Sequence, residues 1–125
     1  MEFSSRRLAD VVVGVPAGPI DHENAQALQR ALAPILNAPA DGTTALLLDF
    51  EGVDYISSMG LRVLMVAAKQ MRARSARIAV ASLSPVVKEI FDIARFNHVT
   101  EVFPSVRAAL EQMSAAALAA YEAAR

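Results

Sequence analysis

Two adjacent serines and a glycine stand where the segment "DFEGVDYISSMGLRVLM" (residues 49–65) passes from one apolar run into the next. This pattern predicts a strand ending at Asp49 and a helix that begins with Ser57 or Ser58 as its N-cap. A capping hydroxyl accepts a hydrogen bond from a free backbone N–H, which is worth about 1 kcal/mol. The cap explains one serine. It does not explain the second, nor Gly60 in the first helical turn, where glycine costs about 0.5 to 1 kcal/mol relative to alanine. Because helix N-termini attract anions, the segment is predicted to be a contact point or a phosphate site.

Three carboxylates in the same segment, Asp49, Glu51 and Asp54, offer the oxygen ligands that a hard cation prefers. Successive side chains of a strand alternate between its two faces, so the three groups need not converge on one ion. The pattern favours a solvated loop over a metal site.

An aspartate at the end of a buried strand also accepts phosphate in response-regulator receivers. Those domains need an acidic pair after the first core strand and a lysine after the last one. Here residues 16–18 follow the first core strand as Pro-Ala-Gly, and no lysine comes after Lys88. His22 and His98 have no companions for a triad or a zinc site, and no Gly-rich P-loop is present. We therefore expect no enzyme activity, no catalytic residue, no metal and no cofactor.

The composition narrows the classes of function further. The 125 residues fit one domain, and 54% hydrophobic with 20% charged residues is typical of a packed globular protein. The formal net charge is -1 and the basic residues are scattered, which argues against nucleic acid as a partner. The chain has no cysteine and no run of about eighteen apolar residues. We expect a cytoplasmic protein that is not inserted directly into a membrane.

Strand and helix patterns alternate along the chain. Short apolar runs bounded by turn residues predict buried strands at residues 11–15, 45–50, 77–83 and 100–103. Apolar residues at helical spacing predict three helices between these strands, and Ser84 and Ser105 look like N-caps. Pro34 is expected to kink the first helix or end it early. The alternation predicts an α/β fold with a four- to five-stranded, mixed but mostly parallel sheet and about four helices.

The two ends of the chain add to this core. The segment "EFSSRRL" is predicted to pair antiparallel with the first core strand through a turn at Ala9 and Asp10. The alanine-rich residues 114–125 favour a helix that extends the last one past a domain of residues 1–113. A solvated, fraying helix is favoured over one that covers a neighbour.

Seven apolar positions recur at strand or helix spacing and are predicted to be buried: Leu46, Leu48, Leu64, Ile78, Val80, Ile90 and Phe91.

The segments "GPID" (residues 18–21), "LLLDFEGVDYI" and above all "SSMGLRVLM" resemble the STAS domain of bacterial anti-sigma factor antagonists. The resemblance covers nearly the whole chain and leaves only the alanine-rich tail outside. It implies partner switching. The unphosphorylated antagonist binds a serine-kinase anti-sigma factor, phosphorylation by that kinase ends binding, and a PP2C-type phosphatase restores it.

The match departs from the family at the phosphoacceptor. The best-known members read Asp-Ser-Ser-Gly or Asp-Ser-Thr-Gly, with the hydroxyl just before the glycine as the acceptor. Here Met59 occupies that position, and methionine cannot be phosphorylated. The resemblance favours Ser58 as the acceptor, with Ser57 as the alternative. A further alternative is that both serines only cap the helix.

The resemblance also implies a partner surface around the start of the second predicted helix, made by Asp21, Ser57, Ser58, Met59, Gly60 and Arg62. Ser58, Met59 and Arg62 are expected to be exposed. Two functions remain open: a phosphorylation-switched antagonist, and an unphosphorylated scaffold or subunit of a signalling or lipid-transport complex. The chain is expected to be a monomer or a weak dimer.

Overall fold

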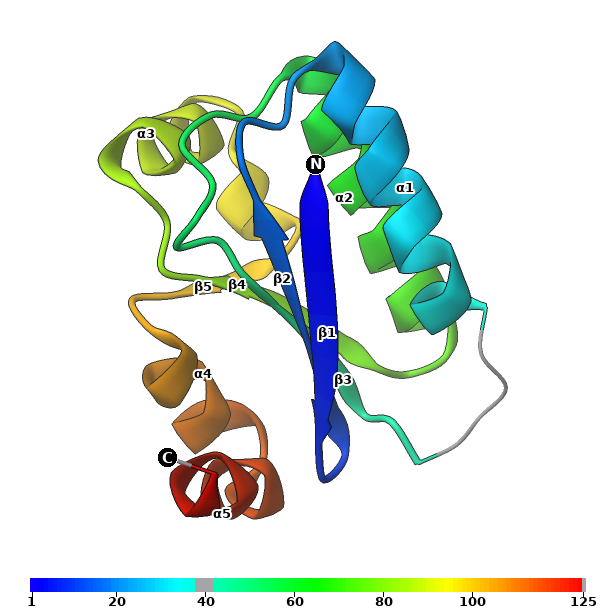
Figure 1. Cartoon of the computed structure of the whole chain (residues 1–125), viewed down its shortest axis with the longest axis vertical. Coiled ribbons are helices and arrows are strands. Elements are labelled where there is room, and N and C mark those ends of the chain that lie inside the picture. The colour runs from blue at the N-terminus through cyan, green and yellow to red at the C-terminus, as the bar shows by residue number, and fades with distance from the viewer. Residues whose placement is uncertain (38–41, 125) are drawn as a thin grey trace.

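The computed structural model (Figure 1) describes residues 1–37 and 42–124, and these form one mixed sheet covered by helices on both faces. The strand order is β1-β2-β3-β4-β5, with β1 antiparallel to β2 and the other neighbours parallel. The strands are β1 (Glu2–Leu8), β2 (Val11–Ala17), β3 (Ala45–Asp49), β4 (Arg77–Ala81) and β5 (Glu101–Phe103). The predicted α/β class and mostly parallel sheet are confirmed, as is the antiparallel pairing of the N-terminal segment.

Five α-helices and one short 3-10 helix connect these strands or follow them within the described residues. They are α1 (His22–Leu36), α2 (Ser58–Ala73), α3 (Pro85–Ile93), η1 (Phe96–His98), α4 (Val106–Met113) and α5 (Ala115–Ala123). The predicted N-caps Ser84 and Ser105 are confirmed, because each hydroxyl accepts a hydrogen bond from the backbone N–H three residues later. Helix α1 continues through Pro34 and ends two residues later at Leu36.

The two faces of the sheet are buried by different helices, as strand alternation requires. Leu46, Leu48, Ile78 and Val80 point to the side of α1, α2 and α3. The intervening residues, mostly alanine and valine with Leu47, point to the side of α4 and α5. Figure 1 shows α1 and α2 on one side of the sheet and α4 and α5 on the other.

Six of the seven residues predicted to be buried are in the core, and Ile90 is the exception. Ile90 is only partly buried and packs against the edge of the α1–α2–α3 core. Its neighbours Val87 and Phe91 supply the buried face of α3, so Ile90 lies at the margin of that face. The helical spacing predicted the helix correctly, but it included Ile90 in a buried face that is narrower in the structure.

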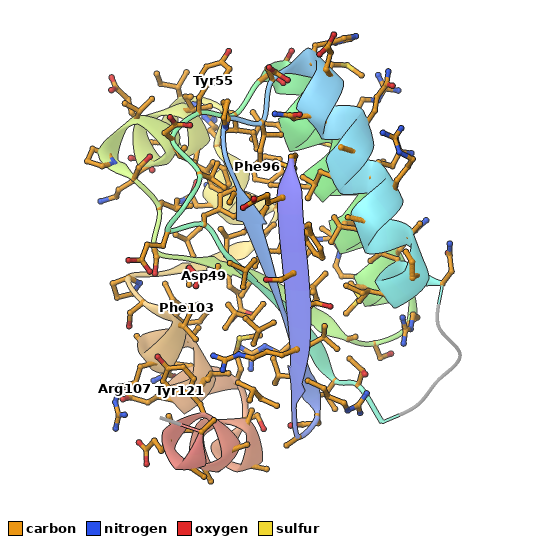
Figure 2. The ribbon with its side chains drawn as sticks, in the orientation of Figure 1. Asp49, Tyr55, Phe96, Phe103, Arg107 and Tyr121 are labelled. Atoms are coloured by element: carbon orange, nitrogen blue, oxygen red, sulfur yellow. The ribbon has the colours of Figure 1, made fainter. Side chains whose placement is uncertain are left out.

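The prediction for the C-terminal tail was wrong in two respects. The tail does not extend α4, because Ser114 has extended backbone (φ -164°, ψ 114°) and starts a separate helix, α5. Helix α5 also packs on the domain instead of fraying in water, since Ala117 is fully buried and Arg107 forms an ion pair with Glu122 (2.5 Å). Figure 2 shows Arg107 and Tyr121 together at the α4–α5 end of the molecule. Arg125, the last residue of the predicted tail, lies outside the described residues.

Candidate functional site

The N-termini of α1 and α2 are joined by a short backbone ladder. The Ile20 N–H donates to the Tyr55 carbonyl and the Ser57 N–H donates to the Ile20 carbonyl, both at 2.8 Å. Ile20 and Ile56 form an isolated parallel bridge between the two loops. The N-cap of α1 (Asp21) and the N-cap of α2 (Ser57) therefore each follow a residue of the same bridge, and both helices begin at the same end of the molecule (Figure 1).

The "GPID" loop is held by hydrogen bonds of its own. Gly18 has a positive φ of 98°, which favours glycine, and its N–H donates to the Gly52 carbonyl (2.9 Å). The Asp21 carboxylate accepts from the Asn24 N–H (2.8 Å), and the Asn24 side chain donates to the Pro19 carbonyl (2.7 Å). Asp21 is exposed, and it lies beside the start of α2, where the family resemblance placed it. Its carboxylate is nevertheless also committed to capping α1.

The two adjacent serines have different roles in the local structure. The partly buried Ser57 is the N-cap, and its Oγ accepts from the Gly60 N–H (3.2 Å). Ser58 is the first residue of α2 and is exposed. Across residues 1–37 and 42–124, no hydrogen bond engages the Ser58 hydroxyl. The helix cap thus accounts for Ser57 and leaves Ser58 free for another purpose.

Gly60 is required by packing inside the protein. It is buried, and a Cβ at this position would lie 2.7 Å from both Ile20 Cγ2 and Ile56 Cγ1. Those two isoleucines are the residues of the bridge that joins the helix starts. Internal packing thus accounts for Gly60, and the interpretation of its segment as a contact point or phosphate site stays a prediction. The glycine lets α2 begin directly against the bridge.

Met59 and Arg62 lie on the outer side of α2 and are exposed, as predicted. Met59 is 37% exposed, so it does not turn into the core. Both residues line a groove of about 260 Å³ between α1 and α2. The described residues offer Arg62 neither an ion pair nor a hydrogen bond, so its charge is available to a ligand.

Two features near the starts of α1 and α2 were not predicted from the sequence. Tyr55 is 45% exposed in the loop before Ser57, and Figure 2 places it at the end where α1 and α2 begin. An aromatic residue two positions before the cap was a usable signal. The groove itself gave no sequence signal, because the residues of α1 and α2 that line it meet only in the folded chain.

The carboxylates of the preceding loop do not gather into a metal site. The Asp49 carboxylate accepts from the Glu51 N–H (3.1 Å), which turns it back toward its own loop. Within the described part of the chain, no group of three or more metal-ligating side chains is arranged around a common point. In the same part of the chain, no helix is both long and apolar enough to cross a bilayer.

Comparison with known proteins gives consistent matches. Residues 3–109 match the family model of the STAS domain. A candidate anti-sigma factor antagonist from Bordetella bronchiseptica, BtrV, is 31% identical over 109 residues, covering 87% of this chain and 91% of that protein.

Solved structures share the fold at lower identity. The crystal structure of a candidate anti-sigma factor antagonist from Thermotoga maritima has a TM-score of 0.81 at 20% identity, covering 89% of this chain and 93% of that one. An anti-sigma factor antagonist from Mycobacterium paratuberculosis has a TM-score of 0.77 at 22% identity, covering 88% and 91%. Helix α5 lies beyond the range matched by the family model.

Proposed function

This chain belongs to the STAS domain family, and from that premise we propose that it acts as an anti-sigma factor antagonist controlled by phosphorylation of Ser58. Unmodified, it binds a serine-kinase anti-sigma factor and so frees a sigma factor. Phosphorylation of Ser58 by that kinase ends the binding, and a PP2C-type phosphatase restores it. Its relation to anti-sigma factor antagonists rests on the Bordetella protein.

One observation carries the choice of Ser58. The Ser57 Oγ caps α2, whereas the adjacent Ser58 is exposed and its hydroxyl makes no hydrogen bond with the described residues. A kinase needs a hydroxyl that can reach its active site, and only Ser58 meets this condition without uncapping α2. This supports Ser58 over Ser57 as the acceptor, although Met59 occupies the family's usual acceptor position.

The fold should tolerate the modification. A phosphate adds roughly -1.5 to -2 charges at neutral pH, and at the first position of α2 it faces the unpaired N–H groups of a helix N-terminus. The helix dipole favours an exposed anion there by about 0.3 to 1 kcal/mol. The first turn of α2 contains no acidic residue that would repel it.

Phosphorylation of Ser58 should, in contrast, weaken binding of the anti-sigma factor. In a packed interface the phosphate would add bulk and an anion that must lose its water, and such mismatches cost about 2 to 5 kcal/mol. Arg62 lies four residues after Ser58, on the same face of α2, so a phosphate could also draw its guanidinium away from the partner. The partner surface in this proposal comprises Asp21, Ser57, Ser58, Met59 and Arg62. Gly60 supports it from beneath.

The test uses a purified serine-kinase anti-sigma factor from the same organism, ATP, and mass spectrometry of the modified chain. Wild type and Ser57→Ala should be phosphorylated at Ser58 and then lose at least about tenfold in affinity. Ser58→Ala should bind persistently and resist phosphorylation, and Ser58→Glu should bind poorly.

Two results would change the conclusion. Phosphorylation of Ser58→Ala at Ser57 would show that the chosen acceptor is wrong. If neither serine is modified and both alanine variants behave as wild type, the constitutive scaffold replaces the switch. Co-purification with a transporter ATPase would then identify a transport-complex subunit.

The proposal places the chain in the cytoplasm, as a monomer or weak dimer. It assigns the chain no nucleic-acid partner, cofactor or catalytic residue.

A further inference from the structure

We propose that the groove between α1 and α2 binds an acidic amphipathic helix of the anti-sigma factor, with Arg62 pairing to a carboxylate on that helix. This inference rests on the proposed function, because the groove continues the partner surface. Met59 and Arg62 belong to both.

The residues that line the groove extend along both helices for a length that suits a docked helix. On the α1 side it is lined from Gln29 to the C-cap Asn37, and on α2 from Met59 to Gln70. At 1.5 Å per residue these stretches are about 12 and 16 Å long, which corresponds to about two to three turns of a docked helix. Recognition of this kind uses apolar anchors one turn apart, and parallel neighbouring helices provide a matching trough.

The floor of the groove is apolar and its rim is polar. Leu36 and Val63 are partly buried in the floor and lie over the core residue Leu32, which is fully buried. Val66 is 45% exposed on the wall, although it is a large apolar side chain. Gln29 and Gln70 are exposed and supply polar groups to the lining. The exposed apolar side chains of Met59 and Val66 are what a helix with one apolar face would cover.

The charge around the groove selects an acidic partner. Among the described residues that line it, Arg62 is the one that carries a charge. Helix α2 contains three basic residues, Arg62, Lys69 and Arg72, and no acidic residue. Because Arg62 is exposed and makes no ion pair with the described residues, a carboxylate at the rim of the docked helix gains a partner without breaking an existing pair.

A matched pair of variants on α2 tests the groove. Val66 and Met65 are adjacent and similarly exposed, at 45% and 39%, but only Val66 lines the groove. By calorimetry with the purified serine-kinase anti-sigma factor, Val66→Lys should weaken binding about tenfold or more, and Met65→Lys should bind as wild type. Both variants should unfold at the wild-type urea concentration, because both positions are on the surface.

Cross-linking locates the docked segment. The chain has no cysteine, so a single introduced thiol can be labelled selectively with benzophenone maleimide. Gln70→Cys in the groove should cross-link to a kinase segment with an acidic amphipathic helical pattern, and Lys69→Cys outside it should not. Arg62→Glu should weaken binding, and replacing the facing acidic residue of that segment by lysine should restore it.

Three outcomes would overturn the inference. Equal affinities of Val66→Lys and Met65→Lys would show that the kinase binds elsewhere, while the proposed function stands. Binding of dodecanoate by wild type but not by Val66→Lys, with kinase affinity unchanged, would assign the groove to a small amphiphile. Failure of the wild-type chain to bind the kinase at all would overturn the proposed function together with this inference.

Discussion

Helices α2 and α5 both begin with a serine N-cap, but the two capping hydroxyls make different contacts. At α5, the Ser114 hydroxyl accepts from the Ala117 N–H (3.1 Å) and donates to the Asp10 carboxylate (2.5 Å). Asp10 also accepts from the Thr44 hydroxyl (2.7 Å), so this cap ties the C-terminal helix to the β1–β2 turn and the start of β3. At α2, the Ser57 side chain only caps its helix, and a second serine with an unused hydroxyl follows it.

This difference separates structural serines from a candidate functional one. Both contacts of the Ser114 hydroxyl are to other residues of this chain, and three alanines follow this cap at the start of α5. Ser58 has no such contact, and its neighbours Met59 and Arg62 are exposed beside a groove. A hydroxyl that the fold does not use is the better candidate for modification. Disrupting each region should therefore affect different measurements.

The largest effect is expected at Gly60, which supports the α2 start from inside. Gly60→Val should lower the free energy of unfolding by about 3 kcal/mol, because its side chain would overlap Ile20 and Ile56. Urea unfolding followed by circular dichroism measures this loss. Ser58→Val, two residues earlier and exposed, should unfold within about 0.5 kcal/mol of wild type. Equal stabilities of the two variants would contradict the packing role of Gly60.

The next effect is on binding alone. Met59→Asp should abolish measurable binding of the anti-sigma factor, a loss of about 2 kcal/mol or more, because it places an anion in an apolar contact. Thermal unfolding should change little, since Met59 is 37% exposed. A large drop in melting temperature would instead assign Met59 to the core and weaken the contrast between the two helix starts.

Removing the two caps compares the regions directly. Ser114→Ala should cost about 1.5 kcal/mol of stability, because it loses both the α5 cap and the bond to Asp10. Ser57→Ala should cost about 1 kcal/mol, because it loses the cap only. Neither variant should stop phosphorylation at Ser58. The comparison fails if Ser57→Ala proves the more destabilising of the two in urea.

The smallest effect is a dependence on pH at the α5 start. The hydrogen bonds from Ser114 and then Thr44 lower the pKa of Asp10 below its ordinary value of 3.8. A lowered folded-state pKa means that this stabilisation is complete above 3.8 and is lost as the pH falls through the folded-state value. The stability difference between wild type and Asp10→Asn should therefore shrink on acidification. A difference that stays constant from about pH 7 to pH 3 would contradict this linkage.

Most of the fold could be predicted from the sequence, because its local signals agree with one another. The apolar runs at β2, β3 and β4, the Ser84 and Ser105 caps and the N-terminal hairpin were all predicted from short-range patterns. The errors came where packing decides. The spacing in α3 could not tell that Ile90 lies at the margin of the core, and the alanine-rich composition of α5 could not tell that Ala117 is buried.

For the site, the sequence by itself determined which residues stand at the start of α2, since the cap pattern and the motif "SSMGLRVLM" are both local. The tertiary structure decided how they are used. The Ile20–Ile56 bridge explains Gly60, and the hydrogen bond to Ser57 leaves Ser58 free. The groove exists only because α1 and α2 pack side by side. The physical reason is that caps and periodicity act within a few residues, whereas burial and grooves depend on segments far apart in the chain.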